Sequence, residues 1–157
     1  MVCGREEFGL VLGPDQKVYA IGGYNSEQQH CLTSIERYDI DQDCWEIVTH
    51  LNTPMKAVGA AVLPDGIYVI GGYEEAKSNY SKDVQRYDIA NSCWHKAASM
   101  NYARGAFTAT TLTTCEYIYA VGGFGVDGCP TDKVERYDVA KDKWESVAPL
   151  HTPRFMH

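Results

Sequence analysis

The chain has 157 residues, 45% of them hydrophobic and 22% charged, and a formal net charge of −7. This composition predicts a soluble globular domain, and the negative charge without any basic run argues against a nucleic-acid partner. There is no run of 18 apolar residues, and charges at Arg5, Glu6 and Glu7 interrupt the N-terminus where a signal peptide needs apolar residues. We therefore expect a cytoplasmic protein that does not contact membranes.

Three segments recur along the chain with a period of about 50 residues. The first copy holds VYAIGGY (18–24) and IERYDI (35–40), followed by Trp45. The second holds IYVIGGY and VQRYDI before Trp94, and the third holds IYAVGGF and VERYDV before Trp144. A fourth marker occupies one equivalent position at the start of each copy, at Arg5, Met55 and Arg104, and recurs at Arg154 after the third copy.

Each copy is predicted to form four short strands. In the second copy we expect strands at 58–63, 67–70, 84–88 and 93–97, because these stretches are rich in β-branched and aromatic residues. Pro64-Asp65-Gly66 predicts a tight turn between the first two. Small residues in the first strand, such as Gly59, suit the crowded centre of a tapering assembly, and a repeat of four antiparallel strands is typical of a propeller blade.

Gly-Gly after an aromatic-containing strand, then a tyrosine-aspartate pair and a tryptophan, resembles the kelch repeat. The resemblance implies an all-β fold: three four-stranded antiparallel kelch blades forming about half of a β-propeller. The blades are expected at roughly 5–51, 56–100 and 105–150, and residues 152–157 would begin a further blade. Trp94 is expected to pack between blades. In this reading the chain is incomplete, a fragment of a six-bladed ring, and the alternative is two copies assembled head to tail.

Within the kelch family, the repeat sequences most resemble those of kelch-like proteins, whose propellers follow BTB and BACK domains. This resemblance implies a non-enzymatic protein-interaction module that presents substrates to a cullin-RING ubiquitin ligase, with the cullin bound by domains outside this chain. Within the binding class, an actin-associated kelch protein is the rival. A propeller enzyme such as a copper oxidase is the alternative from a different class.

Partner-binding residues are expected where the copies differ. The loops at 24–33, 73–82 and 124–132 vary most, and in kelch-like receptors the residues after Gly-Gly and after the repeat arginine line the substrate pocket. The residues at these positions are Tyr24, Ser26, Tyr73, Glu75, Phe124, Val126, Glu6, Glu7, Lys56, Ala57, Gly105, Ala106, Phe155 and Met156. Because three of them are glutamates, a basic or neutral peptide with an apolar anchor is the expected ligand.

Other candidate sites have simpler structural explanations. Arg104 and Arg154 repeat with the blade, so a structural role is favoured over anion binding, and Met55 is expected to alter its junction. Residues 123–128 match G-x-G-x-x-G, but a loop and a strand follow instead of the helix that a dinucleotide needs. We expect no catalytic residue, cofactor or metal. The sequence leaves open one alternative, a metal site built from histidines of separate blades. The six cysteines are expected to be free thiols: Cys3, Cys31, Cys44, Cys93, Cys115 and Cys129.

Overall fold

The computed structural model describes residues 1–112 and 117–157, which form three four-stranded antiparallel sheets. The first sheet has the order β1 (Gly9–Leu12), β2 (Val18–Ile21), β5 (Ser34–Asp39) and β6 (Cys44–His50). The second has the order β8 (Gly59–Leu63), β9 (Gly66–Ile70), β12 (Val84–Asp88) and β13 (Cys93–Ala97). The third has the order β15 (Thr108–Thr111), β16 (Tyr117–Val121), β18 (Val134–Asp138) and β19 (Lys143–Val147).

The expected all-β fold is confirmed, and the second sheet matches its predicted strands closely. Strands β8 and β9 each begin one residue away from the expected position, and β12 and β13 have the expected bounds. Leu63 pairs with Gly66 across the Pro64-Asp65 turn, as the sequence indicated. Within the described residues no helix has the length and apolar character that crossing a bilayer requires.

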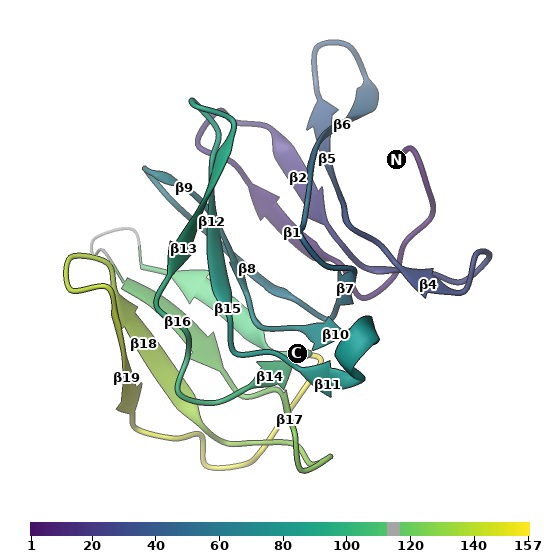
Figure 1. The fold of residues 1–157 in the computed structure, drawn as a ribbon. Coiled ribbons are helices and arrows are strands. Elements are labelled where there is room, and N and C mark those ends of the chain that lie inside the picture. The colour runs from purple at the N-terminus through teal and green to yellow at the C-terminus, as the bar shows by residue number, and fades with distance from the viewer. Residues whose placement is uncertain (113–116) are drawn as a thin grey trace.

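Seven two-residue strands form three smaller sheets at one end of the molecule (Figure 1). They are β3 (Tyr24–Asn25), β4 (His30–Cys31), β7 (Met55–Lys56), β10 (Tyr73–Glu74), β11 (Asn79–Tyr80), β14 (Arg104–Gly105) and β17 (Phe124–Gly125). A single 3₁₀ turn, η1 (Glu75–Lys77), connects β10 to β11. We call this end the loop face. In Figure 1 it lies opposite the turns that join β5 to β6 and β12 to β13.

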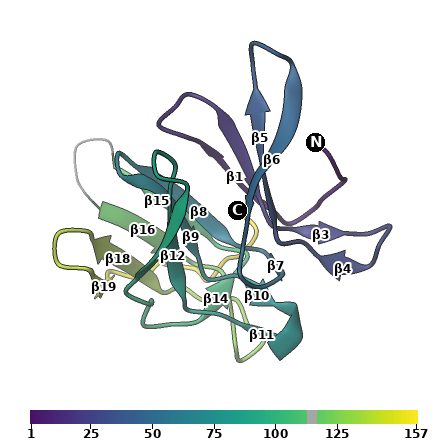
Figure 2. The same cartoon turned by 45° about the horizontal axis from the view of Figure 1, so that its top comes forward.

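The three sheets stand around a common centre, with their first strands innermost (Figures 1 and 2). Strand β8 contacts both β1 and β15. The small residues of these strands make room for the neighbouring sheet: a Cβ at Gly59 would lie 2.3 Å from the ring of Phe107. This close approach explains why β8 and β15 are rich in small residues.

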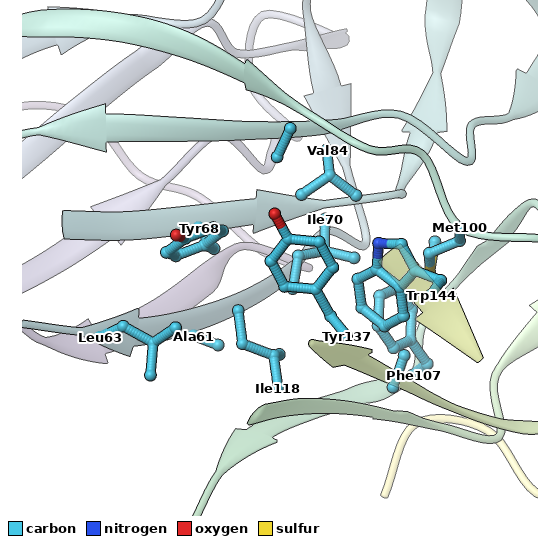
Figure 3. Packing of buried hydrophobic residues seen from close by; sticks show 12 residues of the cluster. Ala61, Leu63, Tyr68, Ile70, Val84, Met100, Phe107, Ile118, Tyr137 and Trp144 are labelled. Carbon is cyan, nitrogen blue, oxygen red and sulfur yellow. The ribbon is translucent and has the colours of Figure 1, made fainter. Parts of the chain in front are cut away.

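The largest part of the core lies between the second and third sheets. Figure 3 shows Tyr137 and Trp144 of the third sheet against Tyr68 and Ile70 of the second. The rings of Tyr68 and Tyr137 are 5.9 Å apart, and the indole N–H of Trp144 donates to the Ala98 carbonyl at 2.9 Å. The second and third sheets therefore bury facing surfaces against each other, as expected for stacked blades.

The same arrangement joins the first and second sheets. Tyr19, Ile21 and Ile35 of the first sheet pack against residues of β9 and against Tyr87. The indole of Trp94 packs against this cluster and donates to Thr49 Oγ1 at 3.3 Å, so the expectation that Trp94 lies between blades is confirmed. Trp94 is half-buried, whereas Trp144 is almost completely buried.

The Gly-Gly pairs hold each sheet against the segment that begins the next. Gly71 and Gly72 have φ angles of 55° and 100°, a region that side chains disfavour. The N–H of Gly72 donates to the carbonyl of Arg104 at 2.9 Å, and a Cβ on Gly71 would lie 2.6 Å from that same oxygen. Equivalent bonds run from Gly23 to Met55 and from Gly123 to Arg154. Gly-Gly ends the strand because backbone must approach backbone there.

Candidate functional site

The loop face brings together most of the residues predicted from the sequence. In each repeat, the residue after Gly-Gly pairs with a residue next to the repeat-arginine position. The pairs are Glu6 with Tyr24, Lys56 with Tyr73, and Gly105 with Phe124. These pairings form small sheets at the loop face, separate from the three large sheets.

A chain of backbone hydrogen bonds links the repeats at that centre. The N–H of Ala57 donates to the backbone carbonyl of Glu7 at 2.7 Å, and the N–H of Ala106 donates to the carbonyl of Ala57 at 2.9 Å. The N–H of Met156 in turn donates to the carbonyl of Ala106 at 2.8 Å. All four residues have a positive φ, between 52° and 54°. They line a cavity of about 210 Å³ together with Phe8, Val58 and Phe107. This cavity offers a small, mostly apolar recess.

Four aromatic rings form a continuous row across the loop face. Tyr73 meets Tyr80 edge-on at 5.5 Å, Tyr80 lies 6.1 Å from Phe124, and Phe124 meets Phe155 edge-on at 5.1 Å. We call these four residues the aromatic row. Tyr80 was not among the predicted residues, since it lies late in a loop and has no counterpart in the other repeats. Its ring covers Gly105, where a Cβ would come within 2.7 Å.

Lys56 lies at the Tyr73 end of the aromatic row. Its ammonium nitrogen is 5.0 Å from the ring centre of Tyr24, 6.0 Å from that of Tyr73 and 3.1 Å from Glu7 Oε1. Burial lowers the pKa of Lys56, but the hydrogen bond and charge of Glu7 outweigh it, so the pKa is raised overall. Lys56 therefore stays charged and ties the first repeat to the second.

The remaining glutamates of the predicted site have two different roles. Glu6 is exposed and accepts a hydrogen bond from Ser26 at 2.8 Å, so its charge stays at the surface. Glu75 instead accepts the backbone N–H of Cys31 at 2.9 Å, which connects the loops of the first two repeats. A neutral N–H leaves the charge of Glu75 in place, so Glu6 and Glu75 carry negative charge on the loop face, whereas Glu7 is paired with Lys56.

Val126 lies apart from this arrangement. Its side chain is 62% exposed and lines a separate pocket of about 480 Å³. Tyr102 and Lys133 line the same pocket, with the Lys133 ammonium 3.5 Å from the ring centre of Tyr102. The structure therefore places Val126 outside the aromatic row, although Phe124 is only two residues away.

Arg104 is a structural residue rather than an anion site. Its guanidinium is fully buried and donates to the carbonyls of Gly122 and Lys133, both at 2.7 Å, and to Glu135 at 3.1 Å. Burial lowers the pKa of Arg104, and the charge of Glu135 opposes this fall. These partners hold Nη1 and Nη2 within the third repeat, and the side chain has no exposed surface that a ligand could reach.

The other candidate motifs also have structural explanations. The glycines of 123–128 form a closed turn in which Gly125 donates to the Cys129 carbonyl at 3.0 Å, and the chain then enters β18. The cysteines at positions 3, 31, 44, 93 and 129 are free thiols, as expected. Cys115 lies outside the described residues.

Comparison with known proteins identifies the family to which this architecture belongs. The model of the KLHDC2/KLHL20/DRC7 kelch-repeats domain matches residues 2–155. The chain belongs to the kelch-repeat family. It is similar to the influenza virus NS1A-binding protein homolog B of Danio rerio, with 43% identity over 49 residues, or 31% of the chain. The Xenopus laevis homolog is 41% identical over the same length, and each match covers 7% of the relative.

Kelch repeats form interaction modules that bind protein partners, and this general function applies to the chain. A kelch repeat-containing protein of Dictyostelium discoideum is 42% identical over 33 residues, which is 21% of this chain and 5% of that protein. The matches to these relatives span about one repeat, so they support the repeat pattern and not a shared partner.

Proposed function

We propose that the loop face is the partner-binding surface of this kelch module and that the aromatic row is its anchor. The observation that carries the proposal is the unbroken contact from Tyr73 through Tyr80 and Phe124 to Phe155. Half-exposed aromatic side chains that cluster at the centre of a surface are frequent energetic hot spots. Here they come from two repeats and from the segment after the third.

The charge around the aromatic row supports a neutral or basic peptide as the ligand. Glu6 is exposed at one end, while Lys56 and Glu7 form an ion pair that adds no net charge. The cavity beside Ala57 and Ala106 is mostly apolar and would receive one apolar side chain of such a peptide. An acidic peptide would meet repulsion from Glu6, and Lys56 at the Tyr73 end of the row is already paired with Glu7.

For the full-length product we propose the role of a cytoplasmic substrate adaptor of a cullin-RING ubiquitin ligase. Support comes from the resemblance of the repeat pattern to kelch-like adaptors. The relatives named as NS1A-binding proteins also have names that describe binding to another protein. Co-precipitation of a cullin with the full-length product tests this role, and failure to recover any cullin would contradict it while leaving the peptide-binding proposal intact.

A displayed random-peptide library tests the binding surface. We expect the 157-residue chain to select peptides with an aromatic or aliphatic anchor and no net negative charge. A variant carrying Tyr73→Ala, Tyr80→Ala and Phe124→Ala is expected to select none of them. Val126→Ala is the matched control, because Val126 lies on the same face but outside the row. Equal selection by the triple variant, or enrichment of acidic peptides, would contradict the proposal.

A further inference from the structure

One group of side chains outside the loop face combines three different metal-binding chemistries. Within residues 1–112 and 117–157, Asp88, Cys93 and His95 offer a carboxylate, a thiol and an imidazole whose ligand atoms all lie within 4.8 Å of one another. They belong to the hairpin formed by β12 and β13. In Figure 1 the turn of this hairpin lies at the opposite end of the sheet from β10 and β11.

The strand register explains why the three side chains converge. Asp88 and Cys93 are directly opposite each other in the antiparallel pair, and His95 follows Cys93 by two residues, so all three lie on one face of the hairpin. Cys93 Sγ is 3.3 Å from His95 Nε2, and that nitrogen is 4.0 Å from Asp88 Oδ2. In a tetrahedral zinc site such ligand atoms are about 3.3–3.6 Å apart, so a small rotation of side chains suffices.

Asp88 is already oriented for this purpose. Its Oδ1 accepts the backbone N–H of Asn91 at 3.0 Å, and its Oδ2 accepts the Asn91 side-chain amide at 2.9 Å. These two hydrogen bonds lower the pKa of Asp88, with the side-chain bond having the larger effect. Hydrogen bonds to a ligating carboxylate commonly fix its direction in metal sites.

The hairpin of the first sheet provides a matched comparison. Cys44 stands opposite Asp39 just as Cys93 stands opposite Asp88. However, Glu46 replaces the histidine there, and Asp39 is paired with Lys17. The equivalent cysteine therefore lacks both the imidazole and an unpaired carboxylate, so only the second hairpin offers a complete set of these three groups among the described residues.

We propose that Asp88, Cys93 and His95 form a zinc-binding site on the rim of the second sheet. Thiolate, imidazole and carboxylate ligands together suit Zn²⁺, and water would complete the tetrahedron because the His95 side chain is 46% exposed. Binding would release the Cys93 thiol proton to solvent and join β12 to β13 through the ion. This site is independent of the proposed peptide-binding face.

Titration of the reduced 157-residue chain with Co²⁺, followed by displacement with Zn²⁺, tests the site. We expect one equivalent of Co²⁺ to produce a thiolate-to-cobalt charge-transfer absorption that Zn²⁺ abolishes. Cys93→Ser is expected to remove this absorption, and His95→Gln is expected to weaken binding by about tenfold or more. Cys44→Ser should behave as the wild type.

Thermal unfolding supplies the second readout. A zinc ion that binds the folded state should raise the melting temperature of the wild type and of Cys44→Ser, but not that of Cys93→Ser. Because the three side chains lie at the surface, the metal-free variants should melt like the wild type. The proposal is overturned if the wild type gives no cobalt–thiolate absorption, or if the absorption persists in Cys93→Ser.

Discussion

Arg104 and Glu135 form an ion pair in which both side chains are completely shielded from solvent, with Nη2 3.1 Å from Oε2. Arg5 and Glu36 form the same buried pair in the first sheet. The second sheet has Met55 and Gln85 at the two equivalent positions, so it lacks both members of the pair. The arginine and the glutamate are therefore present together or absent together among the three sheets.

This relationship predicts that Arg104→Met strongly destabilises the fold. The substitution leaves Glu135 buried without its cation, which should lower the free energy of unfolding by about 3–5 kcal/mol. The double variant Arg104→Met/Glu135→Gln reproduces the pair of the second sheet and should recover part of the loss. Urea denaturation measures both variants. If the double variant is as unstable as the single one, the buried charge is not the cause.

Two of the repeat tryptophans, Trp94 and Trp144, should differ in their contribution to stability. Trp144 is 4% exposed, and its indole N–H donates to the Ala98 carbonyl at the end of the second sheet. Trp144→Ala should therefore lower the free energy of unfolding by about 3–5 kcal/mol, the usual range for a buried aromatic. Trp94→Ala should cost less because Trp94 is half-buried. Chemical denaturation of the two variants checks this order, and a larger loss for Trp94 than for Trp144 would show that burial does not set the cost.

Two glycines with positive φ should respond differently to alanine. Gly128 has a φ of 71° and no atom within 4 Å of a built Cβ, so Gly128→Ala should cost about 1–2 kcal/mol from backbone strain alone. In Gly71→Ala the new Cβ would also collide with the carbonyl of Arg104. Such overpacking should add about 1–3 kcal/mol. Equal melting temperatures for the two variants would argue against the backbone contact between sheets.

Cys31 should be alkylated more slowly than the exposed cysteines Cys44 and Cys129. Burial raises its pKa to about 11, and the nearby charge of Glu75 acts in the same direction. The thiolate is the reactive form, so little of it exists at pH 8. Brief alkylation at that pH should modify the exposed Cys44 and Cys129 well before Cys31. Peptide mass spectrometry gives the order, and early modification of Cys31 would contradict its burial.

The strands of the repeat could be predicted because their signals are strong and recur. Residues such as Ile67 and Val69 have high β propensity, and the Pro64-Asp65-Gly66 turn marks the boundary between two of them. The position of Gly71 and Gly72 was also informative, although the sequence alone did not show that their partner is the carbonyl of Arg104. That contact comes from a segment more than 30 residues away.

The parts that escaped prediction have identifiable reasons. Two-residue strands such as β10 are too short to show any periodicity, so the pairing of Lys56 with Tyr73 was not foreseen. Tyr80 has no counterpart in the other repeats. Its role became apparent only from the contacts of its ring with the rings of Tyr73 and Phe124. The paired loss of Arg and Glu could have been noticed, because Gln85 stands within the second copy of the repeated motif.

The affinity of the best library-selected peptide for Phe124→Ala most directly tests whether the aromatic row binds the partner. Phe124 contacts both Tyr80 and Phe155, so its removal divides the row. Isothermal titration calorimetry should show at least about a tenfold loss of affinity relative to the wild type and to Val126→Ala, with little change in melting temperature. Undiminished affinity in a folded Phe124→Ala protein would contradict the account.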